Sequence, residues 1–153
     1  IDFNQAMDAR LVNEDNAKLL AKVKWIKGRI RFGCDTHGQI KDCERAMELI
    51  NTNGFKGEYF LYTMIGGNSD FTESYERIHY WWEKLQNFRH NKVGRAVYAY
   101  AQPYRDPDKK NTPPMWQLDM ARWVNKRMIF CTTDFKDFSP RKGFVCGKYF
   151  DNQ

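Results

Sequence analysis

Four short segments of the chain combine apolar side chains with few internal charges, and each is followed by a longer amphipathic stretch. They span residues 1–4, 29–34, 58–65 and 96–101. The third and fourth segments, EYFLYTMI and AVYAYA, are rich in aromatic residues. Such apolar runs are typical of strands that are buried on both faces, as in a parallel sheet between two layers of helices.

An amphipathic helix is predicted after each of these strands. Asn13 is an expected N-cap because its side chain can accept hydrogen bonds from first-turn N–H groups, and Glu14 and Asp15 then suit the positive end of the helix dipole. The second helix is expected to end at Asn53-Gly54, because glycine readily adopts the left-handed conformation that closes a helix. The other predicted boundaries are Thr72 as the cap of the third helix and Pro113-Pro114 at the start of the fourth.

The resulting order, βαβαβαβα, predicts an α/β fold of repeated βα units with a parallel sheet. The first three strands begin at intervals of about 28 residues, which is the size of one βα unit. Right-handed crossovers make the strands parallel and place them in chain order. The pattern allows half of a barrel, with helices on one face, or one side of an open sheet. We assign residues 1–130 to this domain, with a polar loop at 104–114, and residues 131–153 to an irregular C-terminal tail.

The composition favours a folded domain and leaves the kind of partner open. Hydrophobic residues make up 42% of the chain and aromatic residues 16%, which excludes a disordered chain. No apolar run approaches the ~20 residues that span a bilayer, and the chain does not open with a secretory signal. We therefore expect a cytoplasmic protein without a membrane partner. The net charge of +6 suits a phosphate-rich partner or a mildly basic solvated surface.

The four cysteines predict reduced thiols. Cys34, Cys43, Cys131 and Cys146 include no CxxC pair and do not form a disulfide framework in a chain of this length. The sequence opens within an apolar segment and without an initiator methionine. This opening predicts a fragment or a processed product.

Polar residues and glycines follow the end of every predicted strand. Because ligands of parallel α/β proteins bind beyond the carboxyl ends of the strands, this rim predicts a binding surface. Gly66-Gly67 would let a ligand approach the backbone closely, or would only make a turn. Arg10 could hold a carboxylate by two-point geometry, or could form a surface ion pair with Asp8.

Five stretches of the sequence together resemble the second half of radical S-adenosylmethionine (SAM) proteins, in particular a bacterial and phage group with DARL and ARWVN motifs. In chain order they read FNQAMDARLVNEDNAKLLAKV, IRFGCDT, FLYTMIGGNSDFTESYERI, AYAQPYRDP and WQLDMARWVNKR. The resemblance covers residues 1–150 and implies a partial, TIM-like (βα)₆ barrel in which these four strands are the third to the sixth. It also implies that the complete protein binds SAM at a 4Fe–4S cluster and cleaves it reductively to a 5′-deoxyadenosyl radical.

The same resemblance implies which residues of this chain bind SAM. By position they are Gln5 and Arg10 after the third strand of the family's barrel, Asp35 at the end of the fourth, Gly66 and Gly67 at the end of the fifth, and Gln102 and Tyr104 at the end of the sixth. No catalytic residue, no metal ligand and no particular substrate can be carried over to this sequence.

One family motif, the CxxxCxxC loop that holds the cluster, is absent from this sequence. Without three thiolates the chain alone is expected to hold no cluster and to be inactive, so the cluster half would lie on a missing N-terminal part or on another chain. Two alternatives remain open. One is a fragment of an unrelated α/β barrel enzyme. The other is a nucleic-acid-binding module that uses Trp81, Trp82, Tyr100 and Tyr104 beside Arg122, Lys126 and Arg127.

Overall fold

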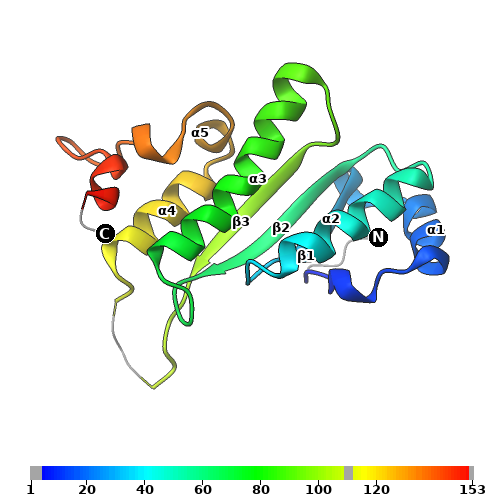
Figure 1. Cartoon of the computed structure of the whole chain (residues 1–153), viewed down its shortest axis with the longest axis horizontal. Coiled ribbons are helices and arrows are strands. Elements are labelled where there is room, and N and C mark those ends of the chain that lie inside the picture. The colour runs from blue at the N-terminus through cyan, green and yellow to red at the C-terminus, as the bar shows by residue number, and fades with distance from the viewer. Residues whose placement is uncertain (1–4, 109–111, 152–153) are drawn as a thin grey trace.

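The computed structural model, which describes residues 5–108 and 112–151, contains a parallel sheet flanked by helices (Figure 1). Its strands are β1 (Arg29–Gly33), β2 (Glu58–Ile65) and β3 (Val97–Pro103), and their order in the sheet is β1-β2-β3. Both strand pairs are parallel. The predicted α/β fold with a parallel sheet in chain order is therefore confirmed for these three strands.

The predicted first strand, at residues 1–4, lies outside the described residues. Immediately after it, Met7 forms an isolated parallel bridge with Phe32 of β1. The N–H of Met7 donates to the carbonyl of Arg31 at 2.9 Å, and the N–H of Gly33 donates to the carbonyl of Met7 at 3.1 Å. At Met7 the chain thus pairs with β1 in the parallel sense.

The helices begin where side chains can cap them. Asn13 caps α1 (Glu14–Lys22), as predicted, and forms a capping box with Asn16. Asp70, and not Thr72, caps α3 (Phe71–Asn91), because the Asp70 carboxylate accepts the N–H of Glu73. The remaining helices are α2 (Gln39–Thr52), α4 (Met115–Asn125) and α5 (Arg127–Thr132), and the 3₁₀ turns are η1 (Ala9–Leu11), η2 (Ile26–Gly28), η3 (Phe135–Asp137) and η4 (Cys146–Phe150). In the described part of the chain, no helix combines the length and apolarity that a membrane span requires.

Helices α2, α3 and α4 cover one face of the sheet (Figure 1). Along β1 and β2, side chains such as Ile30 and Leu61 are buried beneath them in the core. Alternate side chains, such as Tyr62 and Tyr100, lie on the opposite face and remain partly accessible. The prediction that both faces are buried is therefore wrong, because the helices pack on one side only. We call this second side the open face, which consists of Arg29, Arg31, Gly33, Glu58, Phe60, Tyr62, Met64, Tyr98, Tyr100 and Gln102.

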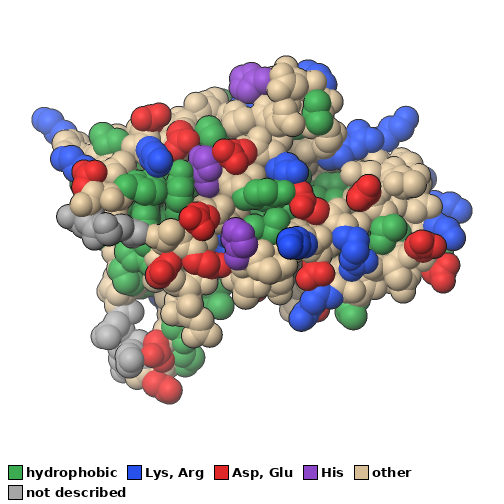
Figure 2. Space-filling model, viewed as in Figure 1, with side chains coloured by type: hydrophobic (Ala, Val, Ile, Leu, Met, Phe, Trp, Pro, Cys, Tyr) green, Lys and Arg blue, Asp and Glu red, His purple; other side chains and the backbone are tan. Residues whose placement is uncertain are grey.

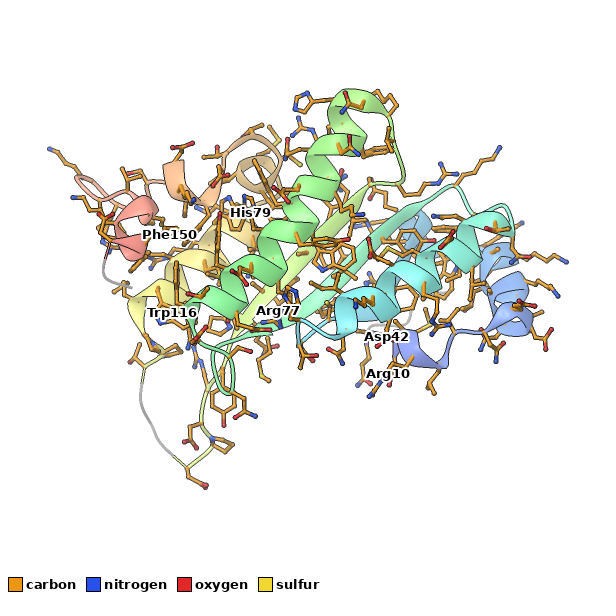
Figure 3. The ribbon with its side chains drawn as sticks, in the orientation of Figure 1. Arg10, Asp42, Arg77, His79, Trp116 and Phe150 are labelled. Atoms are coloured by element: carbon orange, nitrogen blue, oxygen red, sulfur yellow. The ribbon has the colours of Figure 1, made fainter. Side chains whose placement is uncertain are left out.

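The C-terminal segment packs onto α3 and α4. Its described part, up to residue 151, consists of short turns, but Phe135 and Cys146 are fully buried in the same core as α3 and α4. The Nε2 atom of His79 in α3 lies within hydrogen-bond distance, 3.1 Å, of the Asp134 carboxylate, on the side of the helix that faces this segment (Figure 3). The tail is irregular in its secondary structure but is part of the domain core.

One buried carboxylate ties the tail to α4. Asp119 has no exposed surface and accepts hydrogen bonds from three donors: Arg122 at 3.0 Å, Arg141, and the Tyr149 hydroxyl at 2.7 Å. Burial, and then the bond to this carboxylate, raise the pKa of Tyr149 to about 12. Two of these donors come from the tail, so the contact joins the end of the chain to the helix.

Asn125, at the end of α4, closes the outer edge of β3. Its amide nitrogen donates to the carbonyl of Ala101 at 2.9 Å, and its amide oxygen accepts the N–H of Ala101 at 2.8 Å. The side chain thus makes the pair of hydrogen bonds that a neighbouring strand would make. Within the ARWVN motif, Asn125 therefore has a structural role, as does the fully buried Trp123.

Replacing Asn125 with alanine is expected to lower the free energy of unfolding by about 1–3 kcal/mol, because two hydrogen bonds contribute ~0.5–1.5 kcal/mol each. Asn125→Asp is the matched variant, since it keeps the acceptor for the Ala101 N–H but opposes a carboxylate to the Ala101 carbonyl. It should be at least as unstable as the alanine variant. Urea unfolding followed by circular dichroism measures both, and an Asp variant as stable as the unchanged protein would contradict this role.

Candidate functional site at the carboxyl ends of the strands

A recess of about 360 Å³ lies beyond the carboxyl ends of the strands. Its lining comes from the loops that follow β1, β2 and β3, which the parallel sheet brings to one edge. Four of the seven residues proposed from the sequence lie together there. The full lining is Asp35, Thr36, Met64, Gly66, Gly67, Asn68, Ser69 and Tyr104. We call this site the strand-end recess.

The two glycines form its floor and have a backbone conformation that other residues rarely adopt. Gly66 and Gly67 have φ values of +80° and +72°, in the left-handed region. A Cβ atom on Gly66 would lie 1.9 Å from the amide nitrogen of Gln117, and one on Gly67 would lie 3.1 Å from the Tyr104 ring. Gln117 is itself buried, and its Oε1 has no hydrogen-bond partner. The absence of a Cβ therefore lets Gln117 pack against Gly66 and the Tyr104 ring against Gly67, while Gly67 itself remains exposed at the recess.

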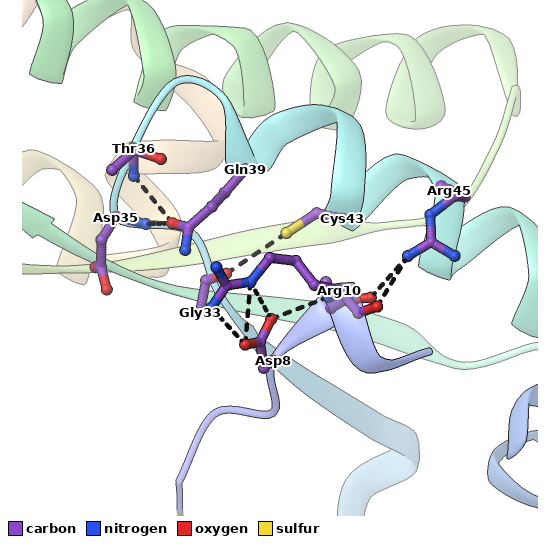
Figure 4. Close-up of polar contacts among 9 residues, drawn as sticks. Asp8, Arg10, Gly33, Asp35, Thr36, Gln39, Cys43 and Arg45 are labelled. Carbon is purple, nitrogen blue, oxygen red and sulfur yellow. Dashed lines mark hydrogen bonds and ion pairs between the residues drawn. The ribbon is translucent and has the colours of Figure 1, made fainter. Parts of the chain in front are cut away.

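Asp35 is held at the rim by the loop that carries it (Figure 4). Gln39, in the first turn of α2, accepts the N–H groups of Asp35 and Thr36 at 2.6 and 3.0 Å. The Asp35 carboxylate accepts the N–H of Met64 at 2.7 Å through Oδ1, which links the end of β1 to that of β2. Its side chain remains exposed and offers a fixed negative charge beside the glycine floor.

A buried arginine that was not proposed from the sequence donates hydrogen bonds to the ends of two strands at this edge of the sheet. Arg77 of α3 has no exposed surface and donates to the carbonyls of Cys34 at 3.3 Å and Met64 at 2.9 Å (Figure 3). It also lies 3.4 Å from the carboxylate of Glu73, which accepts the N–H of His37. Burial lowers the pKa of Arg77 from its usual value, and Glu73 opposes that shift. The sequence feature that could have indicated this role is an arginine on the mostly apolar face of the predicted third helix.

The other three residues proposed from the sequence lie outside the recess. Arg10 is exposed, and its guanidinium forms two-point hydrogen bonds with Asp8 at 2.9 and 2.6 Å (Figure 4). This ion pair lowers the pKa of Asp8 and raises that of Arg10. Gln5 is exposed beside the N-terminal segment, and Gln102 lies on the open face. The local pairing of Arg10, the alternative left open above, is what the structure shows.

The cysteines do not converge on a cluster site. Cys34 and Cys43 are buried together beneath α2, and the Cys43 thiol lies 3.6 Å from the carbonyl of Gly33. Cys146 is buried in the core that the tail shares with α3 and α4, apart from Cys34 and Cys43, and Cys131 packs against that core. Within residues 5–108 and 112–151, no three His, Cys, Asp or Glu side chains are grouped to hold a metal ion. This donor set does not fit a 4Fe–4S cluster, which needs three thiolates in one place.

The four aromatic residues proposed for nucleic-acid binding differ in how far their side chains are exposed. Trp81, in α3, is only 2% exposed and packs in the same core as Ile30 and Leu61, so it cannot stack on a base. Trp82 is half-buried and stacks on His79, with ring centroids 5.1 Å apart. Tyr100 and Tyr104 are 41% and 36% exposed. Trp81 lies on the same buried side of α3 as Ile78 and Leu85, which its place in a run of adjacent aromatic residues did not reveal.

Comparison with known proteins adds no family assignment. No protein-family model, no curated protein and no solved structure matches the chain significantly. What the strand-end recess can bind must therefore be inferred from its own geometry, and the family resemblance of the sequence remains a resemblance.

Proposed function

We propose that the strand-end recess binds SAM and that the chain is the SAM-binding half of a radical SAM-type barrel enzyme. One observation carries the proposal. Asp35, Gly66, Gly67 and Tyr104 come from three separate loops and line a single recess. Its volume of about 360 Å³ falls within the range of small-molecule sites.

The chemistry of the lining suits the adenosine part of SAM. The backbone of Gly67, which is exposed, allows a planar base to approach the edge of the recess that Gly67 and Tyr104 form. The Tyr104 ring, next to Gly67, offers an aromatic surface for that base. The Asp35 carboxylate can accept hydrogen bonds from ribose hydroxyls and attract the positive charge of the sulfonium or ammonium group.

The role proposed for this chain is to bind and orient SAM. In radical SAM chemistry the cofactor pair supplies a 5′-deoxyadenosyl radical. The described cysteines do not fit the cluster, so we assign no step of that reaction to these residues. What they supply is a recess with a fixed carboxylate, supported by Gln39 and by the buried Arg77.

Isothermal titration calorimetry of the purified chain with SAM tests the proposal. Gly67→Ala is expected to abolish binding, because the new Cβ would displace the Tyr104 ring. Asp35→Asn keeps the acceptor for the Met64 N–H but loses the charge. It should weaken binding about tenfold or more, since a hydrogen bond to a charged group contributes ~1.5–3 kcal/mol.

Gly94→Ala is the matched control for backbone strain. Gly94 has a φ of +78°, close to that of Gly67, but a Cβ there would meet nothing within 4 Å. Both variants should lose similar stability, while only Gly67→Ala should lose SAM binding. Failure of the unchanged chain to bind SAM, or equal effects of the two glycine variants, would remove the strand-end recess as the site.

A further inference from the structure

A second cavity, of about 450 Å³, lies on the helix-covered side of the sheet and is lined by residues of both α2 and α3. Tyr59 and Val97 contribute to it from the amino ends of β2 and β3, so it lies at the opposite end of the sheet from the strand-end recess. Met47 of α2 and Trp81 of α3 also line it, and all four of these side chains are buried. We call this cavity the interhelical cleft.

An ion pair joins the two helices across the interhelical cleft. Lys84 of α3 donates to the carboxylate of Glu44 in α2 at 2.8 Å, and the Tyr80 hydroxyl donates to the same carboxylate. Glu44 and Lys84 therefore neutralise each other before any ligand arrives. Because the contact links α2 to α3, it also holds the two walls at a fixed separation.

Three side chains of the cleft offer N–H groups that have no acceptor within residues 5–108 and 112–151. The first is the half-buried guanidinium of Arg95, whose charge reaches the floor: burial raises the pKa of Tyr59, and Arg95 opposes that shift. The others are the amide nitrogens of Asn51 and Asn87. The amide oxygen of Asn51 accepts the Tyr59 hydroxyl at 2.8 Å, and that of Asn87 accepts the Asn91 amide at 2.8 Å. What remains for a ligand is therefore one cation and two amide donors.

The balance of charge in the cleft favours a ligand with a single negative charge. Its charged residues are Glu44, Glu48, Lys84 and Arg95. Since Glu44 and Lys84 neutralise each other, Arg95 and the exposed Glu48 decide which charge the cleft accepts. Basic and acidic side chains alternate over the helix-covered side, so attraction depends on the groups within the cleft itself (Figure 2). Arg95 can hold one carboxylate, whereas the second charge of a phosphate would face Glu48 without a further free cation to offset it.

We propose that the interhelical cleft binds a small organic carboxylate, with its carboxylate on Arg95 and its apolar body against Trp81 and Val97. A guanidinium matches the two oxygens of a carboxylate in paired, charge-assisted hydrogen bonds. The two amides add donors for the same group. A buried apolar lining with a few convergent polar groups is the usual composition of a small-molecule site, and 450 Å³ falls within the range of such sites. The inference does not depend on SAM binding, because the cleft and the strand-end recess share no lining residue.

Nuclear magnetic resonance titration of the isotope-labelled chain with phenylacetate tests the inference. The main-chain N–H signals of Gly94 and Arg95 should shift, because both residues line the cleft, whereas that of Gly67 in the strand-end recess should not. Phenylacetamide has the same shape without the charge and should bind about tenfold more weakly, since hydrogen bonds to charged groups are stronger than those between neutral groups.

Two variants and a matched control assign the carboxylate to its partners. Arg95→Gln should weaken phenylacetate binding about tenfold and leave phenylacetamide binding unchanged. Asn51→Asp keeps the acceptor for the Tyr59 hydroxyl but replaces the amide donor with a negative charge, so it should also weaken phenylacetate binding. Arg89→Gln should change neither, because Arg89 is a half-exposed arginine of α3 that does not line the cleft.

Three results would overturn the inference. One is a titration in which the signals of Gly94 and Arg95 do not shift. Another is equal affinity for phenylacetate and phenylacetamide, or equal effects of Arg95→Gln and Arg89→Gln, because the charge of Arg95 would then play no part. The third is displacement of phenylacetate by an equal concentration of inorganic phosphate, which would indicate unselective attraction of anions. Gly67→Ala should bind phenylacetate normally, so a failure of SAM binding can be told apart from a failure here.

Discussion

Replacing Arg77 with leucine is expected to lower the free energy of unfolding by about 3–5 kcal/mol, the usual cost of removing one partner from a buried charged network. The substitution leaves the carbonyls of Cys34 and Met64 without their donor. It also leaves the carboxylate of Glu73 near the core without the guanidinium that faces it. Since Cys34 and Met64 end the strands that carry the strand-end recess, SAM binding should be lost together with stability.

The matched control for Arg77 is Arg89→Leu, at a half-exposed position in the last turn of the same helix. Substitutions at such positions usually change stability by no more than ~0.5 kcal/mol. Arg77→Lys separates charge from geometry, because lysine keeps the charge but cannot reach two carbonyls with one planar group. Chemical unfolding measures all three variants. An Arg77→Leu variant as stable as Arg89→Leu would show that the strand ends hold together without the guanidinium.

Replacing Asp119 with alanine is expected to cost about 3 kcal/mol of stability and to release the tail from α4. The carboxylate makes three hydrogen bonds, two of them to charged groups that are worth ~1.5–3 kcal/mol each, and such bonds are not fully additive. Both arginines are partly exposed, so they can be rehydrated after the change, which limits the cost.

Limited proteolysis provides the second readout for Asp119. In the alanine variant the segment after α5 should be cut before the sheet, because its links to the domain through Arg141 and Tyr149 are gone. Asp137→Ala is the control, since Asp137 is exposed in η3 of the same segment. If both variants are cut at the same rate as the unchanged protein, the hydrophobic contacts of Phe135 and Cys146 alone hold the tail in place.

The strands could be predicted from the sequence because each is a distinct apolar run. Residues 58–65 are β2 as predicted, and the other two described strands differ from prediction by one or two residues at an end. The convergence of Asp35, Gly66, Gly67 and Tyr104 followed from topology, because parallel strands bring their carboxyl ends to one edge.

What could not be predicted depends on packing between distant segments. The sequence pattern around a tyrosine in an apolar run, such as Tyr62, is the same whether or not helices cover its side of the sheet. The pairing of Arg77 with two strand-end carbonyls requires the helix and both strands to be in place. Asp119 likewise gains two of its partners only when the tail folds back from more than twenty residues away. Spacing within the sequence carries no signal for any of these contacts.

The two borders of the sheet are unequal, and this has a practical consequence for joining the domain to other polypeptides. On the β3 side, the amide of Asn125 already occupies the hydrogen-bonding groups of Ala101. On the β1 side, Met7 accepts and donates main-chain hydrogen bonds in the parallel sense. A strand supplied in trans therefore meets an occupied border at Ala101, and it should pair beside β3 only in a variant without this amide, such as Asn125→Ala.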